Sequence, residues 1–290
     1  MMASQKRNLL LLFLGIVVLA GLGYYFYSQM RGESEELSGA KRPGTDESKL
    51  SSGEKPGSVK EEAGPGQVVR EKIASRPYGE EPDCKQIEED VEGFFHYLDQ
   101  KKFVQHLGSG TDAYARFKRI IKRLAADPPI PAGEGIDPII IIQNVYYLYR
   151  ILDRTDIRLI KDVVVNEKDI MEFNLHMFYK WLNLGGRCPD NEGLRPSLKV
   201  LYHYAGFFLN TIGGRAYLFR RSEGLRLLVS YYSILIVHEA DRQGKNYYGI
   251  DVFPFIDPLK QEMSYYPNFE FQSEYIDRLN KVEDYYLQRR

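Results

Sequence analysis

The chain has 290 residues with 39 basic and 40 acidic side chains, which gives a net charge of −1. A charge this close to zero creates no global field that would favour a polyanion, so a nucleic-acid partner is not expected. The length allows a folded domain that buries most of its surface, together with further segments outside that domain.

The first element is an uncharged apolar run of 19 residues that starts at Leu9, LLLLFLGIVVLAGLGYYFY. A helix needs about 20 residues to cross the hydrocarbon core of a bilayer. Lys6 and Arg7 precede the run and acids follow it, and an excess of Lys and Arg marks the cytoplasmic side. We therefore expect a cytoplasmic tail over residues 1–8 and a single-pass anchor over residues 9–28 in a bacterial inner membrane.

A cleaved signal peptide is the alternative, because Val18-Leu19-Ala20 has the small-residue pattern of a cleavage site. The apolar run continues past Ala20, however, and ends in aromatic residues that are favoured at a membrane interface. This favours an uncleaved anchor. In both cases the rest of the chain is exported.

Residues 29–83 are dominated by Gly, Ser, Pro, Glu and Lys. Such a composition cannot bury enough apolar surface to offset the entropy of ordering. A flexible chain of this length has a root-mean-square span of roughly 40 Å. We expect a disordered linker that tethers a helical extracytoplasmic domain, residues 84–290, to the membrane.

Cys84 and Cys188 are the two cysteines of the chain. In an oxidising compartment a disulfide between them is expected, although the sequence gives no distance and two unpaired thiols remain the alternative. The bridge would close a loop of about 105 residues and would stabilise the domain by up to about 4.7 kcal/mol in the chain-entropy model.

Apolar residues recur every three or four positions in the domain, which predicts an all-α fold of about eight helices. In chain order, the expected helices cover 85–107, 112–126, 138–152, 166–184, 196–209, 222–243 and 273–288, with a short turn at 257–258.

Four segments between or within these helices carry more specific expectations. The helix from Pro138 is apolar nearly all round and is expected to be the most buried. Residues 161–166, KDVVVN, are the short candidate for a strand. Gly213-Gly214 predicts a turn, and residues 245–272 are expected to be rich in loops.

The histidines give no pattern typical of a metal site, since neither His-Glu-x-x-His nor Glu-x-x-His occurs. Glu92 with His96 and Glu172 with His176 are each four residues apart on a helix. Such pairs stabilise a helix, and less often the acid orients an imidazole that binds a metal. Neither a metal nor a cofactor is expected.

Two groups of basic residues are candidates for binding. The amphipathic helix 112–126 carries five cations opposite its apolar stripe and would suit anionic lipid headgroups. A second group surrounds the loop before residue 222 and would suit carboxylates or phosphates on a partner. This group consists of Arg215, Arg220, Arg221 and Arg226. A solvated helix face is the alternative for both.

Tyrosine is unusually frequent, with 22 residues. Tyr247 and Tyr248 fall in the expected loop region, where exposed rings would stack on sugars or contact a partner protein. The alternative is that these aromatic residues pack back over the helices.

The sequence thus predicts a membrane-anchored interaction or scaffold protein of the cell envelope, whose helical domain lies in the periplasm and holds a protein partner. One alternative is a glycan-acting enzyme with a catalytic carboxylate in an aromatic groove, which would show as a deep cleft around a buried carboxylate of raised pKa. A second alternative is a carrier of lipid or another apolar ligand, which requires a large cavity.

We expect alkaline phosphatase fused after residue 60 to be active in a bacterial host, because the anchor predicts export of everything beyond it. Phosphatase activity in whole cells is the measurement, and the same fusion after residue 7 is the inactive control. An inactive fusion after residue 60 would show that the predicted orientation is wrong.

Overall fold

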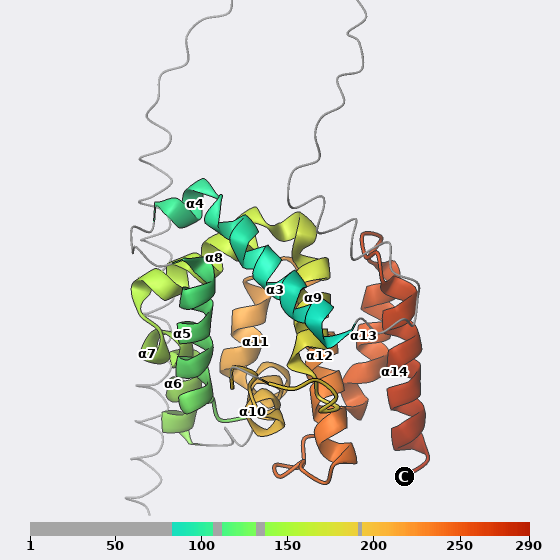
Figure 1. The fold of residues 1–290 in the computed structure, drawn as a ribbon. Coiled ribbons are helices and arrows are strands. Elements are labelled where there is room, and N and C mark those ends of the chain that lie inside the picture. Colours follow the sequence, from blue (N-terminus) through green and yellow to red (C-terminus); the bar gives the residue numbers. More distant parts are fainter. Residues whose placement is uncertain (1–82, 107–111, 132–136, 191–192) are drawn as a thin grey trace, which may run out of the picture. The chain divides into compact units, whose positions relative to one another are not determined.

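A computed structural model of the chain (Figure 1) describes residues 83–106, 112–131, 137–190 and 193–290. The predicted tail, the predicted anchor over 9–28 and the predicted linker up to residue 82 lie outside the described residues. Among the residues that are described, no helix is both long and apolar enough to cross a bilayer.

The described residues form helices and no strands, which confirms the all-α fold class. They contain twelve α-helices and the 3-10 helix η2, where about eight helices were predicted. The helices are α3 (Cys84–Asp99), α4 (Lys102–Gln105), α5 (Ala113–Ala126), α6 (Pro138–Val145), α7 (Tyr147–Ile151), α8 (Arg154–Asn166), η2 (Lys168–Ile170), α9 (Met171–Leu182), α10 (Leu198–Asn210), α11 (Ile212–Phe219), α12 (Glu223–Arg242), α13 (Phe253–Tyr265) and α14 (Gln272–Leu287).

Two helix starts are fixed by side-chain caps. Asp112 accepts a hydrogen bond from the backbone N–H of Ala115 at 2.6 Å and begins α5. Asp137 accepts from the N–H of Ile139 at 2.9 Å, and Pro138 occupies the first turn of α6. Each acid satisfies a donor that the helix itself leaves unpaired.

The number of helices differs because some predicted helices are interrupted and three others, α8, α11 and α13, form in segments predicted to lack helices. The helix from residue 138 divides at Tyr146, where φ is −99° and ψ is 9°. Gly213-Gly214 lies inside α11 and does not form a turn. The region 245–272 contains α13, and Pro258 lies within that helix. Proline inside a helix removes a backbone hydrogen bond and normally ends or kinks the helix. For this reason no helix was expected across Pro258, and α13 was missed.

Residues 161–166, the short strand candidate of the sequence, form the last turns of α8. Asn166 ends this helix, and its side-chain amide donates to the carbonyl of Asp162 at 2.7 Å. Val163 packs against two apolar clusters of the core. This burial outweighs the slight preference of valine for strands.

The most buried helix is α12, which lies among α9, α10, α13 and α14 (Figure 1). Leu227, Ile234, Val237 and Ala240 on this helix are completely buried. They join α10, α13 and α14 in the largest apolar cluster. A second cluster joins α3, α5 and α9.

The prediction that the helix from residue 138 would be the most buried is wrong. On α6 and α7 the buried residues are Asn144 and Tyr147, whereas Ile139 and Ile142 are 65% and 52% exposed. Four successive isoleucines cannot all face the same core, since consecutive side chains point in directions about 100° apart around a helix. One side of α6, with Ile139 and Ile142, therefore faces solvent.

Gly213 makes possible a close crossing of α11 over α6. A Cβ atom at this position would lie 2.6 Å from the backbone carbonyl carbon of Asn144 and 2.8 Å from the nitrogen of Val145. Because both obstacles are backbone atoms, no rotation of a side chain can relieve them. The two helices are in backbone contact at this point.

We expect Gly213→Ala to lower the free energy of unfolding by about 1–3 kcal/mol, because the added methyl group overpacks this crossing. Denaturant unfolding of the full chain is the measurement. Gly93→Ala on α3 is the matched control, since nothing lies within 4 Å of its added Cβ. That variant should be unchanged or more stable by up to about 1 kcal/mol, as alanine favours a helix over glycine. Equal effects of the two changes would contradict the close crossing.

Candidate functional site

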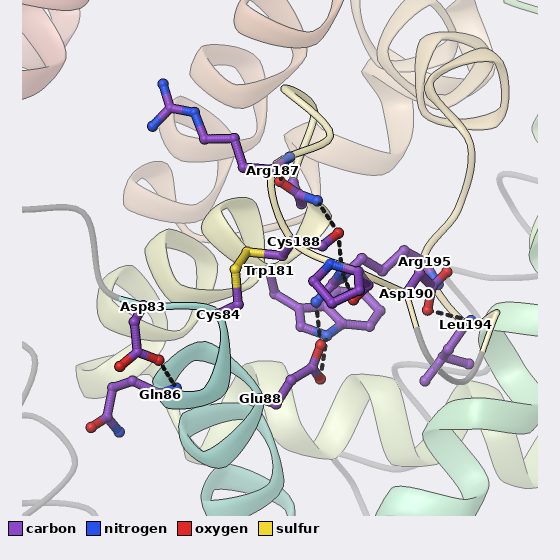
Figure 2. Close-up of polar contacts among 12 residues, drawn as sticks. Asp83, Cys84, Gln86, Glu88, Trp181, Arg187, Cys188, Asp190, Leu194 and Arg195 are labelled. Atoms are coloured by element: carbon purple, nitrogen blue, oxygen red, sulfur yellow. Dashed lines mark hydrogen bonds and ion pairs between the residues drawn. A yellow bond between two sulfur atoms is a disulfide. The ribbon is translucent and has the colours of Figure 1, made fainter.

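Cys84 and Cys188 form a disulfide, as the sequence predicted (Figure 2). Their Cα atoms are 5.4 Å apart although 104 positions separate them in the chain. Cys84 is the first residue of α3, and Cys188 lies in the loop that follows α9. The bridge therefore joins the start of the first described helix to a distant loop.

Polar contacts reinforce this junction. The Glu88 carboxylate accepts a hydrogen bond from Nε1 of Trp181 at 3.1 Å and forms an ion pair with Arg195 (Figure 2). Arg195 also donates to the carbonyl of Pro189 at 2.8 Å. The side-chain amide of Asn183 donates to the carbonyl of Cys188 at 2.8 Å. These contacts hold the loop against α3 and α9, which is a structural role.

A small open pocket of about 280 Å³ lies beside the disulfide. Leu182, Leu184 and Leu198 contribute to its lining, together with Asp190. Both carboxylate oxygens of Asp190 accept backbone N–H groups, from Leu194 and from the next residue, each at 3.1 Å. Asp190 is therefore engaged in shaping the loop that borders the pocket.

Glu172 is a buried carboxylate, and burial raises the pKa of its carboxyl group above the usual range. Its oxygens accept the backbone N–H groups of Glu270 and Phe271 at 2.9 and 3.0 Å. His176, four residues after Glu172, stacks on the Phe271 ring with centroids 4.5 Å apart. This predicted pair thus secures the segment that leads into α14.

The other predicted pair, Glu92 and His96, is exposed on α3. Among the described residues, no group of three or more His, Cys, Asp or Glu side chains is arranged to hold a metal ion.

The four candidate arginines do not converge on one site. Arg226 forms an ion pair with Glu262, and Nε of Arg215 donates to the carbonyl of Leu209 at 2.7 Å. The guanidinium of Arg221 lies 4.3 Å from the centroid of the Tyr217 ring. Arg220 is exposed and forms no ion pair with the described residues, so it is the freest of the four.

The candidate tyrosines lie at the other end of α12. Tyr247 and Tyr248 are 67% and 50% exposed in the loop that follows this helix, whereas Arg220 and Arg221 precede it. The 20 residues of α12 span about 30 Å at 1.5 Å per residue. The structure therefore does not bring the predicted arginines and tyrosines into one site.

The basic helix 112–126, α5, uses part of its charge inside the fold. Arg119 forms an ion pair with the fully buried Asp156 at 2.6 Å. Arg123 pairs with Asp153 at 3.1 Å and with Asp156 at 3.2 Å. These bonds join α5 to α8 and its cap. Fewer cations are available for lipid than the sequence pattern suggested, and lipid contact through α5 stays a prediction.

An exposed apolar stripe runs along α6 and α7. Its residues are spaced three or four apart, which places them on one side of successive helical turns. They are Ile139, Ile142, Val145 and Tyr149, with exposed fractions of 65%, 52%, 36% and 63%.

The neighbouring helix α11 continues this apolar surface. Ile212 is 57% exposed and Phe219, two turns further on, is 76% exposed. The contact of Gly213 with the backbone of Asn144 and Val145 brings α11 against α6 beside Ile212. We name this surface the α6–α7–α11 face. It comprises Ile139, Ile142, Val145, Tyr149, Ile212 and Phe219.

Helices α6, α7 and α11 contain no acidic residue, and their charged residues are Arg150 and Arg215. Arg150 pairs with Asp127 at 2.7 Å. Arg215 is exposed between Ile212 and Phe219, and Arg220 directly follows α11. The face is therefore apolar with a basic margin along α11.

Sequence reasoning missed this face because it assigned the helix from Pro138 to the core. The signal that could have revealed it is the apolar character of all sides of that helix, since a helix at the edge of a domain buries one side only.

No protein-family model, no curated protein and no solved structure matches this chain.

We expect loss of the disulfide to lower the free energy of unfolding by about 2–5 kcal/mol, because the bridge closes a long loop. Thermal unfolding of the wild type with and without reductant is the measurement. The Cys84→Ser/Cys188→Ser double variant is the control and should not respond to reductant. Equal stability of the oxidised and reduced wild type would contradict a stabilising bridge.

Proposed function

We propose that this chain is a membrane-anchored interaction protein of the bacterial cell envelope. In this proposal residues 9–28 hold it in the inner membrane, residues 29–83 form the tether, and the helical domain works in the periplasm. The domain engages its surroundings through the α6–α7–α11 face.

The exposure of this face is the observation that supports the proposal. Folded proteins rarely leave large side chains grouped on the surface, and such patches mark interaction sites. Phe219 at 76%, Ile139 at 65% and Tyr149 at 63% are among the most exposed large apolar side chains of the described residues. Polar substitutions at these positions would remove little buried apolar surface from the domain. The apolar character of these side chains is therefore explained by contacts outside the domain.

Site-specific photo-crosslinking in cells tests the proposal. A photoreactive phenylalanine analogue is placed at Ile142 or Phe219 of the full chain, and adducts to protein and to lipid are both recorded. Leu287 on α14 is the control position, since it is 55% exposed and α14 lies on the opposite side of the body from α6 and α7 (Figure 1).

We expect adducts from positions 142 and 219 and none from position 287. The adduct from position 219 should disappear when Ile142→Glu is added, because a charge at that exposed site opposes apolar contact without disturbing the core. If the two face positions give no adduct, or if the control position gives the same adduct, the face is not an interaction surface and the proposal fails.

A further inference from the structure

We infer that the α6–α7–α11 face lies on the surface of the anionic bilayer in which the chain is anchored, with Phe219 and the isoleucines of α6 entering the region between headgroups and acyl chains. This inference rests on the proposed function and names what occupies its docking surface.

The shape of the face favours a bilayer surface over an inserted peptide. Its largest side chains project into solvent, since Phe219 and Ile139 are 76% and 65% exposed. A groove for a helix or a strand would instead shield its apolar lining on both sides. Projecting apolar side chains on two adjoining helices match the way interfacial helices lie in the plane of a membrane.

Charge supports the same occupant. Arg215 lies between Ile212 and Phe219 along α11, and Arg220 follows at its end. Arg220 is exposed and forms no ion pair with an acid of the described residues, whereas Arg215 donates to the carbonyl of Leu209 and lies 5.6 Å from the centroid of the Phe255 ring. Cations next to projecting apolar side chains complement anionic headgroups, and the acid next to the face is Asp137, which caps the start of α6 at the end away from the arginines of α11 in sequence.

The length of the chain before Cys84 makes this contact attainable. In this proposal the apolar run that ends at Tyr27 is the anchor, and a tether of this length would span roughly 40 Å if it behaves as a flexible coil. A domain held within this distance of the bilayer meets its surface at high effective concentration. A weak interfacial contact is therefore sufficient to keep the face on the membrane.

The face is a better candidate for lipid contact than α5. Arg119 and Arg123 on α5 are paired with acids of α8 and its cap. No large apolar residue of α5 is more than half exposed, whereas four of the face residues are more than 55% exposed. The combination of cations with projecting apolar side chains is found on α11 and not on α5.

Quenching of an introduced indole by brominated lipid tests the inference on the full chain. The natural Trp181 is 2% exposed and serves as a constant background. Phe219→Trp is reconstituted into vesicles of phosphatidylglycerol and phosphatidylcholine that carry bromine near the headgroup. Leu287→Trp is the matched control on the other side of the body.

We expect the indole introduced at position 219 to lose most of its emission and to shift to shorter wavelength, while the one at position 287 does neither. Replacing phosphatidylglycerol by phosphatidylcholine, or adding Arg220→Glu, should restore most of the emission. Near-ultraviolet circular dichroism checks that each variant keeps its tertiary structure.

Three results would overturn the inference: no quenching at position 219, equal quenching at both positions, or a chain that does not float with the vesicles. If position 219 shows no quenching by lipid but its photoreactive analogue forms an adduct with a protein in cells, the proposed function stands and the face binds a protein. An adduct at twice the mass of the chain would assign it to a second copy. Absence of both quenching and adducts would contradict the proposed function as well as the inference.

Discussion

The backbone contact between α11 and α6 determines how this fold presents its surface. Where Gly213 meets Asn144 and Val145, no layer of side chains fits between the two helices. The large side chains of α6 must therefore point away from α11 at this contact. Asn144 of α6 and Tyr147 of α7 turn inward, and Ile139 and Ile142 turn outward. The exposed apolar face is thus a consequence of a contact made by a residue without a side chain.

Much of the fold could be predicted from the sequence because patterns within short segments determine where its helices form. The spacing of apolar residues indicated helices, including the two that begin near residues 112 and 138. The disulfide followed from the number of cysteines and the expected compartment. These predictions depend on short stretches of sequence or on the redox chemistry of the compartment. They do not require knowledge of tertiary contacts.

The errors arose where tertiary contacts decide the outcome. Gly213-Gly214 looked like a turn because glycine is flexible, yet a helix that packs this closely requires glycine. Val163 to Val165 looked like a strand, yet α8 buries part of this segment against α5 and α9. The candidate arginines appeared to form one group because they are close in sequence. Glu262, which holds Arg226, is 36 positions away, and no sequence pattern announced it.

The position of the disulfide has a mechanical consequence. A pull along the chain before residue 83 reaches the folded body at Cys84, the first residue of α3. The ends of helices open more easily than their centres, so a load applied there would normally unwind α3 from its first turn. The bond to Cys188 transfers this load directly to the loop behind α9. The disulfide therefore lets the folded body resist such a pull without unwinding α3.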